Sequence, residues 1–341
     1  MSSAARSTAS ARSRTRSSSP LDTTLPHQKK DILMPVLGAL SVTLEVPDVG
    51  PGITFYTDAG LEAAVDGQIA RFRCAGQDRD SVILIGGAGK KRLHHIALRA
   101  DGLDKIAADA PAAGGTVVDA PEGFTDGGLW VRDPHGMLIH LVERPADPEL
   151  AEGPGFEINR PGRVIRKRRS AVLPRTAYPA AKPLRLGHIL VFSPDVPASV
   201  KFVTEGLGMG LADRAQDIIA FTCARKDSDH HVVAFAKSPD IGFHHASFQV
   251  NDPDEVGRGG RALLAKAGKG DWGFGRHTIG SNFFHYIQDP WGSWFEYYSD
   301  MDHIDDYALW TPTNYAMEDS LASWGPPVPN DFVHNYELKY M

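Results

Sequence analysis

The sequence predicts an α+β protein of two domains, each built from two copies of one βαβββ unit. Three pairs of similar segments predict this fold. Both halves open with a strand, a Pro-Asp turn and a helix; both contain a strand that begins with His-His; and both place an Asp-Pro-x-Gly turn between two strands. Such a repeat indicates a supersecondary unit that recurs along the chain. We expect the paired units of each domain to form an open barrel.

The opening segments are "GALSVTLEVPDVGPGITFYTDAGL" and "RLGHILVFSPDVPASVKFVTEGLG". In each, an apolar strand leads through Pro-Asp into a helix that ends at Gly, the residue that favours a helix stop. The second units open with "RLHHIALRADGLDKIAADAPAAGG" and "GFHHASFQVNDPDEVGRGGRALLAKAG". Each combines a His-His strand, an acidic turn and an amphipathic helix. The closing pair, "WVRDPHGMLIHLVE" and "YIQDPWGSWFEYYS", predicts two hairpin-like turns between strands.

A chain of 341 residues suits two domains with separate cores. We expect a disordered extension at 1–35, an N-terminal domain at 36–147, a linker at 148–183, a C-terminal catalytic domain at 184–305 and a tail at 306–341 that packs on the catalytic domain.

The extension is rich in Ser and Arg and almost free of acidic residues, so it cannot build a core. Two alternatives remain open for it. Its composition is similar to that of an organelle transit peptide, and Met34 is an alternative start of the chain.

The composition narrows the class of partner. The net charge is −6, and no stretch approaches the roughly 20 apolar residues that span a bilayer. We therefore expect neither a nucleic-acid partner nor a membrane partner. The two cysteines, Cys74 and Cys223, are too few for a disulfide framework, which favours a cytoplasmic protein that acts on a small molecule.

Three strands of the C-terminal half carry candidate metal ligands. They are His188 in its first strand, His244 or His245 in the His-His strand, and Glu296 in its last strand. Side chains alternate between the faces of a strand. His244 shares its face with apolar residues and His245 with polar ones, so we expect His245 to be the ligand. Two histidines and one carboxylate form the open ligand set of non-haem Fe(II) sites.

The N-terminal half lacks this set. Its aligned positions hold Ser41, His94 or His95, and His140. Serine is a poor third ligand, so we expect a degenerate site and a structural role for this domain.

Further acid-base side chains follow in the C-terminal half. The segment "DSDHHVVAFA" offers His230 and His231, between which the strand period does not choose, and a later segment offers His277 and Tyr286. Histidine exchanges protons near neutral pH, and tyrosine can hydrogen-bond an oxyanion. Around a metal ion, such groups suit oxygen chemistry on a phenol.

From about residue 36 to the end, the sequence resembles the type I extradiol ring-cleaving dioxygenases of the vicinal oxygen chelate superfamily. The resemblance rests on the four βαβββ units, the His-His-Glu set, and "GRHT", whose histidine stands nine residues before Tyr286 and nineteen before Glu296. The tail "LWTPTNYAMEDSLASWGPPVPNDFVHN" is also similar. One departure is Ile279-Gly280, where many relatives have polar side chains.

The resemblance implies that Fe(II) is held by His188, His245 and Glu296; Mn(II) accepts the same ligands. It implies an acid-base role for His231 and hydrogen bonds from His277 and Tyr286 to the substrate. The implied reaction inserts both atoms of O₂, the co-substrate, into a catechol ring beside the diol, which gives a 2-hydroxymuconic semialdehyde type of product.

Two rival functions remain open on the same architecture: a metal-dependent glyoxalase- or epimerase-like lyase or isomerase, and a metal-free drug-binding protein. The expected substrate is a substituted monocyclic or bicyclic catechol, and we expect a homo-oligomer. Four aromatic residues near the chemical groups in sequence are candidates for the substrate pocket: Trp272, Phe274, Phe283 and Trp294.

Overall fold

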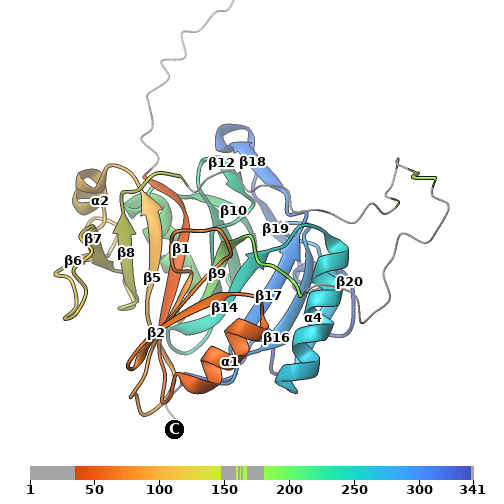
Figure 1. The fold of residues 1–341 in the computed structure, drawn as a ribbon. Coiled ribbons are helices and arrows are strands. Elements are labelled where there is room, and N and C mark those ends of the chain that lie inside the picture. The colour runs from red at the N-terminus through yellow and green to blue at the C-terminus, as the bar shows by residue number, and fades with distance from the viewer. Residues whose placement is uncertain (1–34, 147–158, 160–161, 163, 167–179, 339–341) are drawn as a thin grey trace, which may run out of the picture. The chain divides into compact units, whose positions relative to one another are not determined.

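The computed structural model describes residues 35–146, 159, 162, 164–166 and 180–338. The predicted extension, apart from its last residue, and most of the predicted linker lie outside these ranges. The described residues form two large sheets and one small sheet (Figure 1).

The first large sheet has eight strands, in the order β2-β3-β4-β1-β5-β8-β7-β6. Along the chain its elements follow the predicted βαβββ order twice. The first unit consists of β1 (Val36–Glu45), α1 (Gly50–Asp58), β2 (Glu62–Asp66), β3 (Ile69–Arg73) and β4 (Val82–Ile85). The second consists of β5 (Arg92–Ala100), α2 (Leu103–Asp109), β6 (Thr116–Val118), β7 (Leu129–Arg132) and β8 (Leu138–Val142).

The second large sheet has ten strands, in the order β19-β10-β11-β13-β9-β14-β17-β16-β15-β20. It contains the third and fourth βαβββ units of the chain. The third unit consists of β9 (Arg185–Ser193), α3 (Val196–Lys201) with the π-helix η2 (Phe202–Gly206), β10 (Gly210–Ala215), β11 (Ile219–Cys223) and β13 (Val233–Lys237). The fourth consists of β14 (Gly242–Gln249), α4 (Pro253–Ala267), β15 (Asp271–His277), β16 (Phe283–Gln288) and β17 (Trp294–Ser299). The four predicted units are therefore confirmed, as two open sheets.

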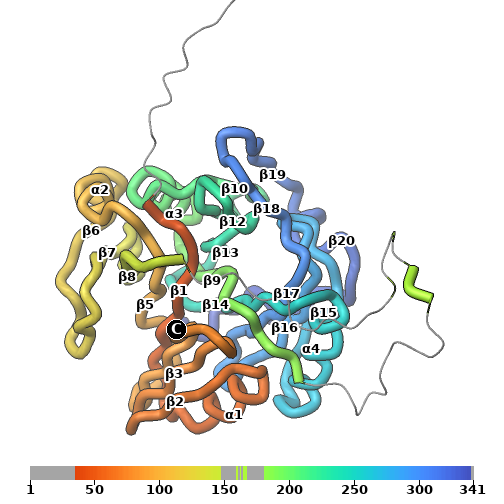
Figure 2. The backbone as a smooth tube through the Cα atoms, turned by 45° about the horizontal axis from the view of Figure 1, so that its top comes forward, coloured from red at the N-terminus to blue at the C-terminus, as the bar shows by residue number. Residues whose placement is uncertain are grey.

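Short elements that the repeat did not predict extend this second half. Strand β19 pairs with β10, and β20 pairs with β15, so the end of the chain borders both edges of the second sheet (Figure 2). Strands β12 and β18 pair with each other. The added elements are β12 (Lys226–Asp229), β18 (His303–Asp306), η3 (Tyr307–Leu309), β19 (Thr313–Tyr315), η4 (Met317–Asp319) and β20 (Ala322–Trp324).

Helix α4 shows how local sequence sets the element ends. The Asp252 carboxylate accepts a hydrogen bond from the backbone N–H of Glu255 at 2.9 Å, and Pro253 starts the helix. These are typical N-terminal helix signals. The helix ends at Gly268, whose φ of +62° suits glycine. Helix α4 lies against β16 and β17, and thereby covers one side of the strands that carry the site.

The Asp-Pro-x-Gly turns are built alike in the two halves. One carboxylate oxygen of Asp133, and likewise of Asp289, accepts hydrogen bonds from the backbone N–H groups two and four residues downstream. The Asp side chain closes the turn by itself, so the turn was predictable from sequence.

The two halves share a hydrophobic core. The rings of Phe55 in α1 and Phe295 in β17 lie 6.0 Å apart between centroids. The buried Tyr297 hydroxyl donates a hydrogen bond to the Ala59 carbonyl at 2.7 Å. The N-terminal half therefore packs against the strand that carries Glu296, one of the predicted ligands.

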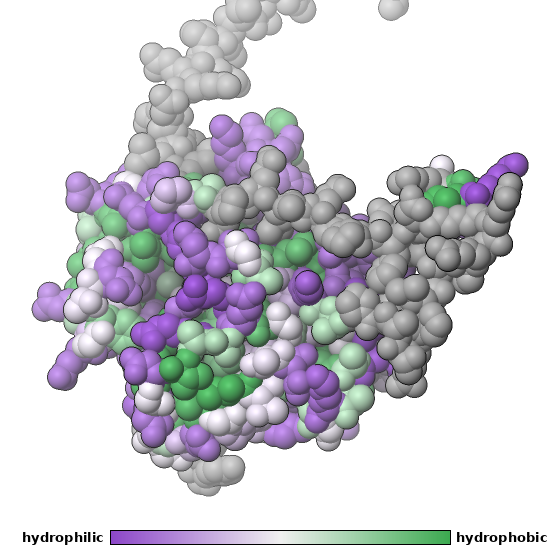
Figure 3. Space-filling view, in the orientation of Figure 1, coloured by the Kyte–Doolittle hydropathy of each residue, from purple (hydrophilic) through white to green (hydrophobic). Residues whose placement is uncertain are grey.

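Hydrophilic residues cover much of the face shown in Figure 3, and hydrophobic residues gather in a smaller patch on it. Within the described part of the chain, no helix combines the length and the apolar character that a membrane span requires.

Candidate active site

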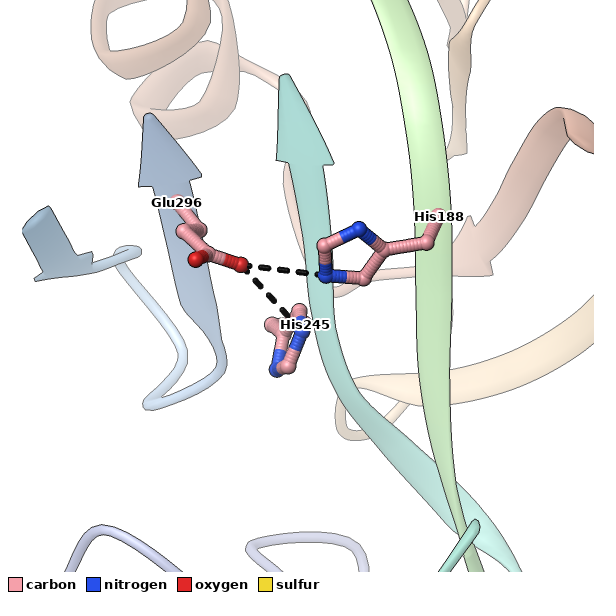
Figure 4. A group of neighbouring side chains, drawn as sticks. All are labelled: His188, His245 and Glu296. Atoms are coloured by element: carbon pink, nitrogen blue, oxygen red, sulfur yellow. Dashed lines mark ion pairs between the residues drawn. The ribbon is translucent and has the colours of Figure 1, made fainter. Parts of the chain in front are cut away.

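Three neighbouring strands bring the predicted ligands together. In the sheet order β9-β14-β17, Ser247 of β14 lies opposite His188 of β9 and opposite Glu296 of β17. His245 precedes Ser247 by two residues and therefore shares its face. One candidate ligand atom from each of His188, His245 and Glu296 lies within 4.8 Å of the others (Figure 4). This is the one such group of three ligands among the described residues.

The three ligand atoms face one another inside the protein. Glu296 Oε2 lies 3.1 Å from His188 Nε2 and 3.6 Å from His245 Nε2. All three side chains are buried. Glu296 Oε2 and His245 Nε2 have no hydrogen-bond partner in the described part of the chain. Buried polar atoms without partners are rare in proteins, and a cation among them would satisfy both. The donor set therefore fits a metal ion.

The protonation states also suit a metal. Burial and the neighbouring His244 hold the pKa of His245 well below its usual range. Burial opposes ionisation of Glu296, but the adjacent His188 and His277 rings outweigh it and hold the pKa of Glu296 well below its usual value. A neutral imidazole and an ionised carboxylate are the forms that bind metal ions.

The structure places His244 away from the three-ligand group. Its Nε2 donates to the carbonyl of Phe332 at 2.7 Å, and its Nδ1 lies 2.7 Å from His245 Nδ1. Since Nε2 carries the proton of neutral His244, His244 Nδ1 accepts a hydrogen bond from His245 Nδ1–H. The remaining nitrogen of His245, Nε2, then presents a lone pair to the group.

The predicted acid-base residues surround the same group. The ring of His231 lies 4.1 Å from that of His188 between centroids. His277 Nδ1 donates to the Leu321 carbonyl at 2.5 Å, which leaves Nε2 as the acceptor for the Tyr286 hydroxyl at 2.9 Å. Burial, followed by the charge of Glu296, raises the pKa of Tyr286 well above its usual value, so this side chain is a hydroxyl donor.

A cavity opens onto these side chains. Asn282 is among its lining residues and donates to Glu296 Oε1 at 3.1 Å. The lining consists of His188, Leu190, Ile219, Phe221, His231, His245, His277, Ile279, Asn282, Tyr286, Ser320, Leu321 and Phe332.

None of the four predicted pocket aromatics is among the described residues that line this cavity. Trp272 and Trp294 are held in a buried cluster, where their indole N–H groups donate to the carbonyls of Pro326 and Phe332 at 3.0 Å each. Phe274 and Phe283 stack on each other at 5.6 Å between ring centroids.

Sequence reasoning also missed residues that do line the cavity. Leu321 and Phe332 come from the tail, far along the chain from the ligands, and no local pattern marks them. Asn282 lies between "GRHT" and Tyr286, so its position in the sequence was a usable signal.

The comparisons with known proteins agree with this geometry. The model of the "Glyoxalase/Bleomycin resistance protein/Dioxygenase superfamily" matches residues 185–297, which include all three candidate ligands. Metapyrocatechase 2 of Cupriavidus necator is 38% identical over 301 residues, which cover 86% of this chain and 90% of that protein.

Two solved structures are similar over most of the chain. A Mn(II)-bound glyoxalase from Novosphingobium aromaticivorans has 26% identity and a TM-score of 0.68, over 89% of this chain and 98% of its own. An extradiol ring-cleaving dioxygenase from B. fuscum has 23% identity and a TM-score of 0.68, over 88% of this chain and 82% of its own, and shows likeness of fold. The chain belongs to the glyoxalase/bleomycin resistance protein/dioxygenase superfamily and, within it, to the extradiol ring-cleaving dioxygenases.

Proposed function

We propose that this protein is an extradiol catechol dioxygenase that uses Fe(II) held by His188, His245 and Glu296. The reaction breaks the ring C–C bond beside the diol and inserts both atoms of O₂, giving a 2-hydroxymuconic semialdehyde type of product. The observation that carries the proposal is the meeting of three buried metal-ligand side chains with His231, His277 and Tyr286 around one cavity. The 38% identity with a metapyrocatechase supports it.

The ligand set favours iron. Two neutral histidines and a carboxylate are typical of non-haem Fe(II) sites that react with oxygen, although Mn(II) accepts the same donors. When bound, the ion supplies positive charge that favours loss of a catechol proton, and coordination positions at which substrate and oxygen meet.

The side chains around the three metal ligands have separate roles in the reaction. Tyr286, as a hydroxyl donor, hydrogen-bonds an oxygen of the diol when substrate is bound, in place of the hydrogen bond that it donates to His277 Nε2 in this structure. His231 takes up and returns a proton on its side of the cavity, since burial and the neighbouring His188 hold its pKa well below the usual range and keep it neutral before reaction. Asn282 holds Glu296 in place.

The cavity wall favours catechols with uncharged substituents. Apart from the chemical groups, its lining is mainly aliphatic and aromatic, and no Lys or Arg side chain is among the described lining residues. A carboxylate on the ring would be buried there without a cationic partner, at a cost of several kcal/mol. We therefore propose alkyl- or aryl-substituted catechols as substrates.

Oxygen uptake by protein loaded anaerobically with Fe(II) tests the function. With catechol and 4-methylcatechol we expect uptake together with a yellow ring-fission product. If the protein consumes no oxygen and forms no ring-fission product with any catechol of a panel that includes 2,3-dihydroxybiphenyl, the proposal is refuted. Turnover of a substrate without oxygen consumption would favour a lyase or isomerase instead.

A paired comparison tests the substrate class. We expect kcat/KM for 4-methylcatechol to exceed that for 3,4-dihydroxybenzoate by at least about 100-fold. Equal values would show that the uncharged wall does not set specificity.

A further inference from the structure

A buried series of hydrogen bonds leads from β10 to His231. Asp213 Oδ2 lies 2.8 Å from His230 Nε2, and His230 Nδ1 lies 3.1 Å from His231 Nδ1. All three side chains are at most 5% exposed. His231 lines the active-site cavity, whereas neither Asp213 nor His230 does. The series therefore connects the cavity to a carboxylate behind its wall.

The chemistry of the groups sets the direction of the bonds. A carboxylate only accepts hydrogen bonds. The other oxygen of Asp213, Oδ1, already accepts the backbone N–H of Thr313 at 2.6 Å. His230 therefore donates from Nε2, and in its neutral form it accepts at Nδ1 from His231 Nδ1–H. His231 is left with its proton on Nδ1 and a lone pair on Nε2.

The same arrangement occurs at the candidate metal ligand. There, the Phe332 carbonyl accepts from His244 Nε2, and His244 Nδ1 accepts from His245 Nδ1. Each His-His pair uses its first ring to fix the proton of the second ring on Nδ1. The two series differ at the far end, where one has a neutral carbonyl and the other has Asp213.

We infer that Asp213 and His230 are positioning residues that fix the tautomer and the ring orientation of His231 for proton transfer. The inference rests on the proposed function for the role of His231, but the tautomer itself does not depend on activity. A residue that acts through His231 in this way would change turnover more than substrate binding.

Asp213 also helps to hold the tail through Thr313, so the test must separate the two contributions. Asp213→Asn offers the sharpest change. An amide has one acceptor oxygen, and if that oxygen keeps the Thr313 N–H, the amide N–H₂ faces His230. The series then reverses, and the proton of His231 moves to Nε2.

Nitrogen-15 NMR of histidine-labelled protein, with diamagnetic Zn(II) in place of the activating metal, measures the tautomer directly. In the unchanged protein we expect a protonated Nδ1 and an unprotonated Nε2 on His231. In Asp213→Asn we expect the reverse. A His231 protonated on Nε2 in the unchanged protein, or the same tautomer in both proteins, would overturn the inference.

Kinetics test the consequence. Asp213→Asn should lower kcat about 10- to 100-fold, a range common for groups that orient an active residue, with KM for the catechol within about twofold. In a His231→Ala background the same change should have no further effect, because an effect that acts through His231 cannot add to its loss.

A matched control is Asn314→Ala, which removes a different contact of the tail to the β10 edge, the hydrogen bond from Gln216 N at 2.8 Å. It should leave kcat within about twofold. Asp213 would have a purely structural role if Asp213→Asn lowered kcat by the same factor in the His231→Ala background as in the unchanged protein. The same conclusion would follow if Asn314→Ala lowered kcat as much as Asp213→Asn. Absence of turnover in the unchanged protein would refute the proposed function. The NMR experiment would still test the tautomer of His231, because it does not depend on activity.

Discussion

The N- and C-terminal halves have the same backbone arrangement but different chemistry at equivalent positions. In the first sheet, Ala97 of β5 lies opposite Ser41 of β1 and His140 of β8. In the second sheet, Ser247 occupies the same place between two of the proposed ligands. The fold therefore supplies strand positions that can converge on a metal, and the side chains decide whether a site forms.

In the N-terminal half, packing and hydrogen bonds occupy the groups that could bind a metal. The Trp130 ring stacks on His140 with centroids 4.0 Å apart, and His140 Nε2 pairs with the Gly127 carbonyl at 2.7 Å. His95 Nε2 lies 3.3 Å from the Thr43 hydroxyl. We propose on this basis that the N-terminal domain has a structural role.

The largest contrast is expected at the last strand of each half. Glu296→Gln should lower kcat/KM for oxygen uptake about 1000-fold or more, because it removes the one charged ligand. His140→Gln, the matched change in the other half, should leave kcat/KM within about threefold. Comparable losses in the two variants would show that the halves do not differ as proposed.

A smaller contrast is expected one strand away. Tyr286 pairs with Glu296 across the sheet just as Trp130 pairs with His140. Tyr286→Phe should lower kcat about 10- to 100-fold through loss of the hydroxyl donor. Trp130→Phe should lower the free energy of unfolding by about 1–3 kcal/mol while kcat stays unchanged. Steady-state kinetics and urea unfolding of both variants measure these two effects. An unchanged kcat in Tyr286→Phe would show that the Tyr286 hydroxyl takes no part in the reaction.

The smallest effect concerns acid stability. Burial, followed by the neighbouring His94, lowers the pKa of His95 to about 3. The folded-state pKa therefore lies below the unfolded value of about 6.5, so the unfolded chain gains a proton first as the pH falls, and stability is lost below about pH 6.5. From about pH 7.5 to pH 5, His95 should account for a loss of about 2 kcal/mol that is absent in His95→Gln. Identical pH dependence of urea unfolding in the two proteins would contradict this.

The sequence predicted those parts of the fold and site that depend on local patterns. The four units were visible because His-His strands and Asp-Pro-x-Gly turns recur, and in the turns Asp133 and Asp289 make their own hydrogen bonds. Strand alternation indicated His245 rather than His244, and the structure places His245 in the three-ligand group.

The cavity wall could not be predicted in the same way. Leu321 and Phe332 reach it because the tail returns to the second sheet, and this depends on tertiary contacts. Trp272 and Trp294 are close to the chemical residues in sequence, yet their indole N–H groups bind tail carbonyls and keep them in the core. Closeness in sequence and aromatic character were not enough to identify a pocket.

The metal content of three purified proteins, loaded anaerobically with Fe(II) and desalted, tests the central claim most directly. We predict about one iron per chain in the unchanged protein and in His95→Ala, and essentially none in His245→Ala. Retention of iron by His245→Ala, or its loss from His95→Ala, would contradict the assignment of the metal site to the C-terminal half.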